Sequence, residues 1–204
     1  MQQFYTGTAY LKRYSTIAKS TFLGLFSPEM SARMFFLDFV LFPPVIMLCL
    51  YLAVDLADPK QWLTAAALVG SGYVAWTLAE YLIHRFAFHH FPVFRALHMA
   101  HHDEPRDLIG TPTIVTLAAF YGLVFWPLAE LTSRQNAAAW TAGLMAGYVS
   151  YIAVHYVVHH LGSHGSLRLR KLIRLHAVHH HDIAHNFGVT TGFWDRVFGT
   201  LAKR

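Results

Sequence analysis

Charged residues are scarce in this sequence of 204 residues. Asp, Glu, Lys and Arg together make up 13% of it, against about 25% in soluble domains. The hydrophobic fraction is correspondingly high, at 55%. So few charged side chains could not cover a soluble core of this size, and so apolar a chain would not remain disordered. The composition therefore predicts an integral membrane protein.

Cysteine and several metal-binding motifs are also missing. The one cysteine, Cys49, lies in an apolar run and cannot form an internal disulfide, so nothing indicates an oxidising compartment. The absence of a Glu-x-x-His motif excludes the soluble di-iron carboxylate bundle. The absence of a His-Glu-x-x-His motif excludes the usual zinc protease. Basic residues interrupt residues 4–26 and leave no apolar core for a cleaved secretory signal.

Long apolar runs, in contrast, are present. At a rise of about 1.5 Å per residue, about 20 residues cross a hydrocarbon core of about 30 Å. Four runs have this length, at residues 35–56, 62–83, 113–131 and 137–158. We expect the first helix to begin with Ser27 as N-cap and Pro28 at its first position. The Pro43–Pro44 pair is expected to kink that helix.

The basic residues predict the orientation of these spans. Four spans place both termini on one side, and 14 of the 16 Lys and Arg residues lie on that side. The opposite side has only Lys60 and Arg134. By the positive-inside rule the termini and the middle loop are cytosolic, in a bacterial inner membrane or the endoplasmic reticulum. The net charge of +5 therefore reports orientation and does not imply a nucleic acid partner.

The expected fold class is all-α, an integral membrane four-helix bundle with a cytosolic helical cap that carries histidine clusters. Residues 1–204 would form a single membrane domain. Within it we expect an interfacial N-terminal segment at 1–27, the four transmembrane helices within 28–160, a histidine-rich cytosolic loop at 84–112 and the cap at 161–204.

The 15 histidines are the most unusual feature of the chain. All lie between His84 and His185, most of them in pairs or triplets near the cytosolic side. Residues three and four apart share one side of a helix, so such histidines can bind one metal or two adjacent metals. The five-residue step from His84 to His89 turns about 140° on an α-helix. We therefore expect the second transmembrane helix to end between them.

Histidine suits a metal site beside a bilayer. Imidazole is neutral near pH 7, binds Fe, Zn and Cu, and lacks the charge penalty of a carboxylate. About ten ligands are too many for one ion and suit two metals with four or five nitrogens each. We expect the other five histidines to be surface or supporting residues: His90, His160, His164, His181 and His185.

The order of the clusters closely resembles that of the fatty acid hydroxylase superfamily of membrane di-iron enzymes, which also includes sterol desaturases. Its signature is a His-x-x-x-x-His or His-x-x-x-His box, a His-x-x-His-His box, a His-x-x-x-His pair and a final His-x-x-His-His box. All four occur in this order between about residues 80 and 200. The box from His84 to His89 and the ending from Asn186 to Thr200 resemble the fatty-acyl 2-hydroxylases.

This resemblance implies a membrane di-iron, O2-dependent lipid hydroxylase that acts at C2 of a free or lipid-linked fatty acyl chain. It implies two Fe ions, although Zn can substitute in purified protein because nitrogen sites bind it at least as tightly. Since the chain has no cytochrome b5 domain, a separate electron donor is expected, such as cytochrome b5 or ferredoxin. The implied metal ligands are His84, His89, His98, His101, His102, His155, His159, His176, His179 and His180.

Supporting residues can also be suggested. Glu80 lies one turn before His84 and is expected to accept the second N–H of that ring, as metal-bound histidines usually require. Asp182 and Asn186 are further candidates. Trp194 and its neighbours are expected to dock the C-terminal segment.

Two alternatives stay open. One is a sterol or carotenoid desaturase or hydroxylase of the same superfamily. The other is a non-enzymatic metal- or haem-binding membrane protein. A di-haem bundle, however, places single histidines within the spans, and a zinc transporter needs ionisable residues near mid-membrane. Here the acidic residues in or beside the spans, among them Asp38 and Glu80, all lie near the ends of the spans.

Overall fold

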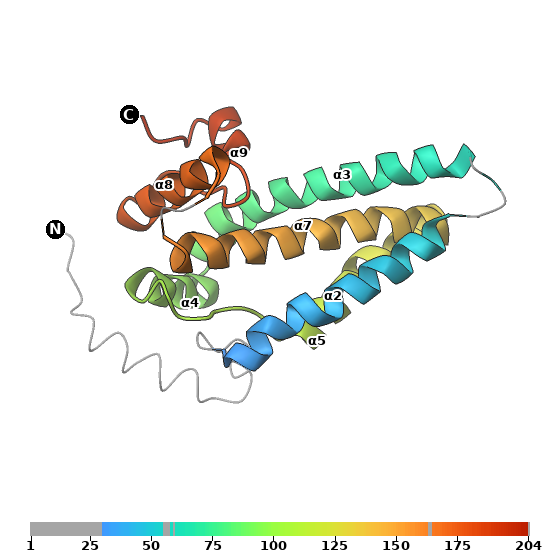
Figure 1. The fold of residues 1–204 in the computed structure, drawn as a ribbon, viewed down its shortest axis with the longest axis horizontal. Helices are drawn as coiled ribbons and strands as arrows, with labels where there is room; N and C mark the ends of the chain where they lie inside the picture. Colours follow the sequence, from blue (N-terminus) through green and yellow to red (C-terminus); the bar gives the residue numbers. More distant parts are fainter. Residues whose placement is uncertain (1–29, 55–57, 59, 163–164, 204) are drawn as a thin grey trace.

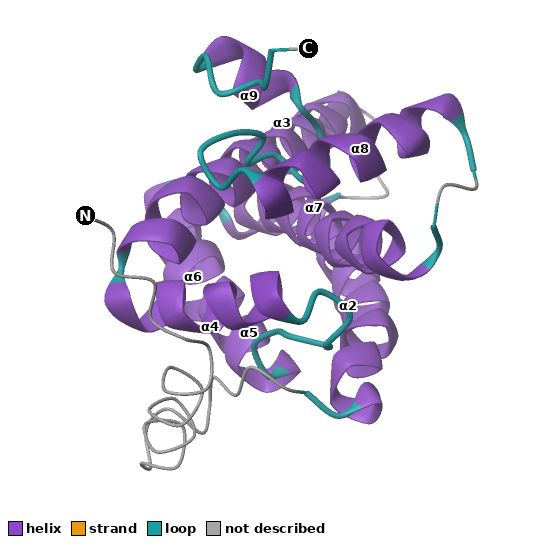
Figure 2. Ribbon diagram, turned by 90° about the vertical axis from the view of Figure 1, so that its left-hand side faces the viewer, coloured by secondary structure: helices purple, strands orange, loops and turns teal. Residues whose placement is uncertain are grey.

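The protein is a bundle of helices with smaller helices gathered at one end (Figures 1 and 2). The computed structural model describes residues 30–54, 58, 60–162 and 165–203. Within these residues every regular element is a helix, which confirms the all-α prediction. The elements are α2 (Ala32–Ala53), α3 (Lys60–Leu82), η2 (Ile83–Phe88), α4 (Pro92–Asp103), α5 (Thr113–Ala119), η3 (Phe120–Phe125), α6 (Trp126–Leu131), α7 (Arg134–His160), α8 (Leu167–His181) and α9 (Phe193–Val197).

Four candidate membrane spans match the four predicted apolar runs. They are Ala32–Ala53, Gln61–Phe88, Thr113–Leu131 and Arg134–His160. The third combines α5, η3 and α6, and the second combines α3 with η2. Large apolar side chains are exposed along the outer helices, among them Val40, Leu63 and Leu123. A lipid environment would cover this surface, so the chain is a multi-pass membrane protein.

The helix of the first span has a serine at its N-terminal cap. Helix α2 starts at Ala32, and the Ser31 side chain caps it by accepting a hydrogen bond from the Met34 amide. The proposed cap at Ser27 and Pro28, like the whole of segment 1–27, lies outside the described residues. The helix continues through Pro43 and Pro44 to Ala53.

Helix α7 is the centre of the bundle, with 61% of its apolar stretch of 18 residues buried against 6% for that of the α3 span. Small residues allow α3 and α7 to approach closely. A Cβ atom added at Gly143 would lie 2.0 Å from the Val69 carbonyl oxygen, and one at Gly72 would lie 2.2 Å from the Trp140 carbonyl oxygen. The two backbones are therefore in contact, and this contact fixes where the ends of α3 and α7 meet.

An aromatic cluster fills the bundle between α2, η3 and α7. Phe42, Phe120 and Tyr148 are buried there, with ring centroids 4.9–5.8 Å apart. The Tyr148 hydroxyl donates a 2.5 Å hydrogen bond to the Asp38 carboxylate. This bond gives a polar partner to an acidic group that would otherwise be costly inside a membrane.

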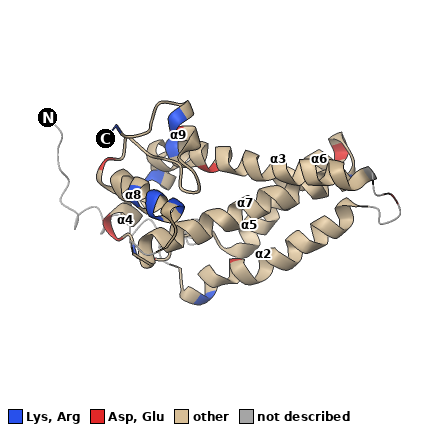
Figure 3. Ribbon diagram, turned by 45° about the horizontal axis from the view of Figure 1, so that its top comes forward, with Lys and Arg blue, Asp and Glu red and all other residues tan. Residues whose placement is uncertain are grey.

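Basic residues gather at the end of the bundle that carries α4, α8 and α9 (Figure 3). Helix α8 alone has Arg168, Arg170, Lys171 and Arg174, all exposed. Ser166 caps the start of this helix by accepting a hydrogen bond from the Leu169 amide. The same end of the molecule holds the histidine clusters.

We predict that Gly143→Ala lowers the free energy of unfolding by about 1–3 kcal/mol, because the new methyl group would force α3 away from α7. The measurement is the thermal unfolding midpoint in detergent. Gly122→Ala is the matched control, since a Cβ atom there meets nothing within 4 Å. Equal midpoints for the two variants would show that the close approach does not stabilise the bundle.

Candidate metal centre

The second span ends at Phe88, between His84 and His89, as predicted. The sequence did not predict that its last six residues, Ile83–Phe88, form the π-helix η2, which His89 follows directly. Hydrogen bonds in a π-helix join residues five apart. The five-residue step therefore brings both rings to the same side, with centroids 5.2 Å apart.

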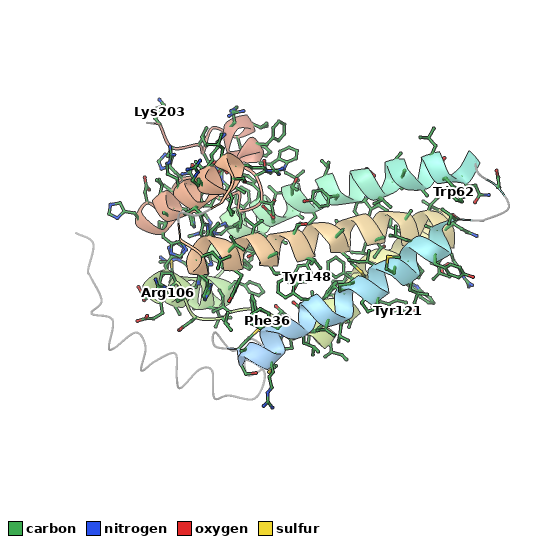
Figure 4. The ribbon with its side chains drawn as sticks, in the orientation of Figure 1. Phe36, Trp62, Arg106, Tyr121, Tyr148 and Lys203 are labelled. Atoms are coloured by element: carbon green, nitrogen blue, oxygen red, sulfur yellow. The ribbon has the colours of Figure 1, made fainter. Side chains whose placement is uncertain are left out.

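The other candidate ligands come from three further helices. Each of these helices carries two or three of them. They are His98, His101 and His102 on α4, His155 and His159 in the last turns of α7, and His176, His179 and His180 on α8. Side-chain nitrogens crowd the end of the bundle where these helices meet (Figure 4). Two neighbouring elements, η2 and α4, and two that are distant from them in sequence, α7 and α8, thus supply one site.

The ring nitrogens form two groups, and within each group the ligand atoms all lie within 4.8 Å of one another. The first group is His84, His89, His98, His102 and His179. The second group is His101, His155, His159 and His176. His180 adjoins the second group, since its Nε2 lies 3.1 Å from that of His176, and its ring stacks on His102. All ten predicted ligands therefore meet.

The remaining histidines lie apart from both groups. His90 and His160 bond to backbone carbonyl oxygens, and His185 pairs with the Asp182 carboxylate at 2.8 Å. His181 is exposed, and His164 lies outside the described residues.

In the first group the Nε2 atoms point at one another. His98 Nε2 lies 2.9 Å from His84 Nε2 and 3.1 Å from His102 Nε2, and the Nε2 atoms of His89 and His179 are 3.2 Å apart. A neutral imidazole has only one N–H, so it cannot satisfy several such contacts. Two nitrogens that each bind one ion at about 2.0–2.1 Å stand roughly 3 Å apart. The group therefore fits a metal ion.

The second group has the same arrangement. His159 Nε2 lies 3.1 Å from His101 Nε2 and 2.9 Å from His176 Nε2. The His155 ring lies beside them, with centroids 4.7 Å from His101 and 4.8 Å from His159. Each of the two groups could thus hold a metal.

Backbone carbonyl groups fix the tautomer of two rings. His84 Nδ1 donates to the Phe187 carbonyl oxygen at 2.5 Å, and His179 Nδ1 donates to the His185 carbonyl oxygen at 2.7 Å. Because a carbonyl oxygen can only accept a hydrogen bond, Nδ1 carries the hydrogen and Nε2 keeps its lone pair. Glu80 was predicted to accept from His84 and does not, since the Phe187 carbonyl takes that place.

Two buried carboxylates hold the segment that supplies these carbonyl groups. Asp195 accepts from the Phe187 amide at 2.7 Å and the Gly188 amide at 2.9 Å. Glu80 accepts from the Val189 and Thr190 amides and from the Thr190 hydroxyl. Both carboxylates thus act on the histidines through the backbone. Sequence reasoning gave Asp195, as a neighbour of Trp194, only a part in docking the C-terminal segment, and missed that it acts on the histidines.

Asn186 lies between the two carbonyl groups and has a left-handed backbone, with φ of 58°. Its side-chain amide donates to the Leu175 carbonyl oxygen and accepts from the Ala202 amide. Asn186 therefore supports this segment, in line with its choice as a supporting residue from the sequence. Asp182, the other candidate, is exposed, and its carboxylate accepts hydrogen bonds only from His185 and the Ala184 amide among the described residues. Trp194 docks the C-terminal segment by donating to the Thr77 hydroxyl.

Burial keeps these imidazoles neutral. Outside the spans, desolvation and the neighbouring histidines lower the pKa of His89 and of His101 to about 3. Desolvation likewise lowers the pKa of His179 to about 4, and that of His180 to about 2. At pH 7 the nitrogens are therefore available to a cation.

Comparison with known families supports a hydroxylase. A family model described as fatty acid hydroxylase matches residues 69–200. A dihydroceramide fatty acyl 2-hydroxylase of Arabidopsis thaliana is 32% identical over 78% of this chain and 69% of its own length. A ceramide very long chain fatty acid hydroxylase of Saccharomyces cerevisiae is 33% identical over 98% of this chain and 54% of its own length. The human fatty acid 2-hydroxylase is 32% identical over 71% of this chain.

A solved structure shares the fold. It is full-length scs7p with only the hydroxylase domain visible, and it matches with a TM-score of 0.71 and 32% identity. The match covers 83% of this chain and 67% of the other. The chain spans about half the length of the yeast relative and 41% of the human one.

We predict two Fe or Zn ions per chain in detergent-purified protein, measured by elemental analysis. His179→Ala removes a nitrogen from the first group and His101→Ala removes one from the second, so each variant is expected to hold about one ion fewer. His181→Ala, an exposed histidine of α8, is the matched control. Metal content that is unchanged in both test variants would exclude these groups as ligands.

We predict that Asp195→Asn weakens metal retention by about 10- to 100-fold, the usual effect of losing a group that orients a ligand. The amide can accept at only one of its two positions, so the segment that holds His84 and His179 is loosened. Metal loss against a chelator is the measurement. Glu130→Gln, an exposed change on α6, should retain metal like the unchanged protein. Equal metal retention in the Asp195→Asn and Glu130→Gln variants would show that Asp195 does not orient the ligands.

Proposed function

The chain belongs to the fatty acid hydroxylase family, and we propose that it is an O2-dependent lipid hydroxylase that places a hydroxyl group on C2 of a fatty acyl chain. The observation that carries this proposal is the pair of converging imidazole groups at one end of a membrane bundle. The relatives described above are named as fatty acyl or ceramide hydroxylases. These names favour an acyl substrate over a sterol or carotenoid.

Two Fe ions are the proposed cofactor, one in each histidine group, with O2 as co-substrate. The ten predicted histidines are the proposed ligands, and His180 completes the second group. When bound, the metal pair supplies the activation of O2, with two delivered electrons, that no side chain can provide. Zn is expected in some purified samples, because the same nitrogen sites accept it.

The protein's own residues position the reaction. The imidazoles provide neutral nitrogen donors beside a bilayer, and the carbonyl groups of His185 and Phe187 fix the direction of two of them. Most of the candidate ligands are buried, which limits the access of water. Since the site lies at the ends of α3 and α7, it lies near the headgroup level. The carbon next to an acyl carbonyl reaches this depth without a tunnel.

The proposed orientation places this end in the cytosol, with both termini on that side. The concentration of Lys and Arg around α4, α8 and α9 supports it (Figure 3). The membrane would be a bacterial inner membrane or the endoplasmic reticulum. The proposal of one membrane domain fits this arrangement, because the cap histidines of α8 join histidines from η2 and α7 in the two groups.

A separate electron donor is part of the proposal. The four exposed cations of α8 lie on the helix that carries His176 and His179. An acidic carrier such as cytochrome b5 or a ferredoxin would be attracted to this face. A carrier bound to this face would then be separated from the metals only by α8.

We predict that a host without 2-hydroxylated lipids makes 2-hydroxy fatty acyl chains when it expresses this protein with an electron donor. Tandem mass spectrometry of the extracted lipids locates the hydroxyl group. His98→Ala is expected to abolish the product, whereas His181→Ala should retain it. Oxygen deep in the acyl chain, or on a sterol, would contradict the proposed regiochemistry.

A further inference from the structure

A pocket of about 380 Å³ lies beside the first histidine group. It is formed where η2, the start of α4 and the segment after α8 meet. Its walls include Arg85, Phe86, His89, Arg95, Ile183 and Phe187. His89 belongs to the first metal group, so the pocket adjoins the proposed metal directly.

Arg85 is held in place but retains free donors. Its guanidinium donates to the Tyr81 hydroxyl at 2.8 Å and lies 5.1 Å from the Phe86 ring centre and 5.8 Å from that of Phe187. A guanidinium has five N–H donors. Among the described residues no carboxylate pairs with it. A half-buried, preorganised guanidinium of this kind is suited to bind a carboxylate through two parallel hydrogen bonds.

Arg95 adds a second positive charge. It lies in the first turn of α4, is exposed, and likewise pairs with no carboxylate of the described part of the chain. The pocket also has an apolar side, because Phe86 and Ile183 are 48% and 41% exposed. Two cations and an apolar wall together match a molecule with an anionic head and a hydrocarbon chain.

We propose that this pocket binds the carboxylate of a free fatty acid, with Arg85 contacting its oxygens and Arg95 adding charge at the rim. The inference rests on the proposed function, because C2 is bonded to the carboxyl carbon. A residue that binds the head must therefore lie within a few ångströms of the metal that acts on C2. Arg85 is the candidate for this contact, since it lines the same pocket as His89.

Equilibrium binding of radiolabelled palmitic acid to the full-length purified protein tests this proposal, with methyl palmitate as the neutral analogue. We expect the acid to bind at least tenfold more tightly than the ester. Arg85→Gln should weaken binding of the acid about tenfold or more, as expected for a charge-assisted pair. Arg95→Gln should weaken it about two- to fivefold, because this charge is exposed. Neither change should alter binding of the ester.

Arg196→Gln, an exposed cation of α9, is the control and should leave binding of the acid unchanged. If Arg85→Gln fails to fold without its bond to Tyr81, the Arg95→Gln result decides. Equal affinity for acid and ester, or for N-palmitoyl dihydrosphingosine and the acid, would overturn the proposal. So would a loss that affects the ester as much as the acid. Because the readout is binding, its failure is distinct from an absence of 2-hydroxylated product.

Discussion

Every imidazole in the two groups has two ring nitrogens, and both need a partner in a region with little water. The Nε2 atoms converge to about 3 Å, and the Nδ1 atoms of His84 and His179 donate to carbonyl groups. The Nδ1 atoms of His101 and His176 are buried without a partner among the described residues. Each buried, unpaired polar group costs about 1–3 kcal/mol. Cations that fill the two groups would offset repulsion among the Nε2 lone pairs, so metal binding and the stability of this end of the bundle are coupled.

That coupling extends to the C-terminal segment. Residues 185–190 are not among the proposed ligands, yet the carbonyl groups of His185 and Phe187 decide which nitrogen of two histidines is free. Glu80 and Asp195 hold this segment from opposite ends through its amides. Glu80 belongs to α3, one turn before His84, so the helix that supplies a ligand also anchors the backbone that orients it. The cap and the membrane helices are therefore one mechanical unit around the histidines.

Features that depend on local chemistry could be predicted from the sequence, and features that depend on distant partners could not. Hydropathy marks each span along the chain, so all four spans were correctly located. The His-x-x-His-His spacing shows which rings share a helix face, and all ten predicted rings meet. The π-turn at His84 has no local signal, because the packing of α3 on α7 and the ring contacts of the site define it. The hydrogen-bond partners of Glu80 were missed for a related reason, since the amides that donate to it lie about 110 residues away.

The two π-helices have a common consequence. A π-turn inserts one residue into an α-helix, which rotates everything beyond it. In η3 it accompanies Phe120, whose ring lies 5.8 Å from both Phe42 and Trp76 in the core. In η2 it aligns His84 with His89 while Arg85, the next residue, faces the adjoining pocket. A straight α-helix would place His89 on another side and could not supply both ligands. The same turn therefore sets the metal nitrogens and the cation beside them, so ligand geometry and recognition of the substrate head cannot vary independently.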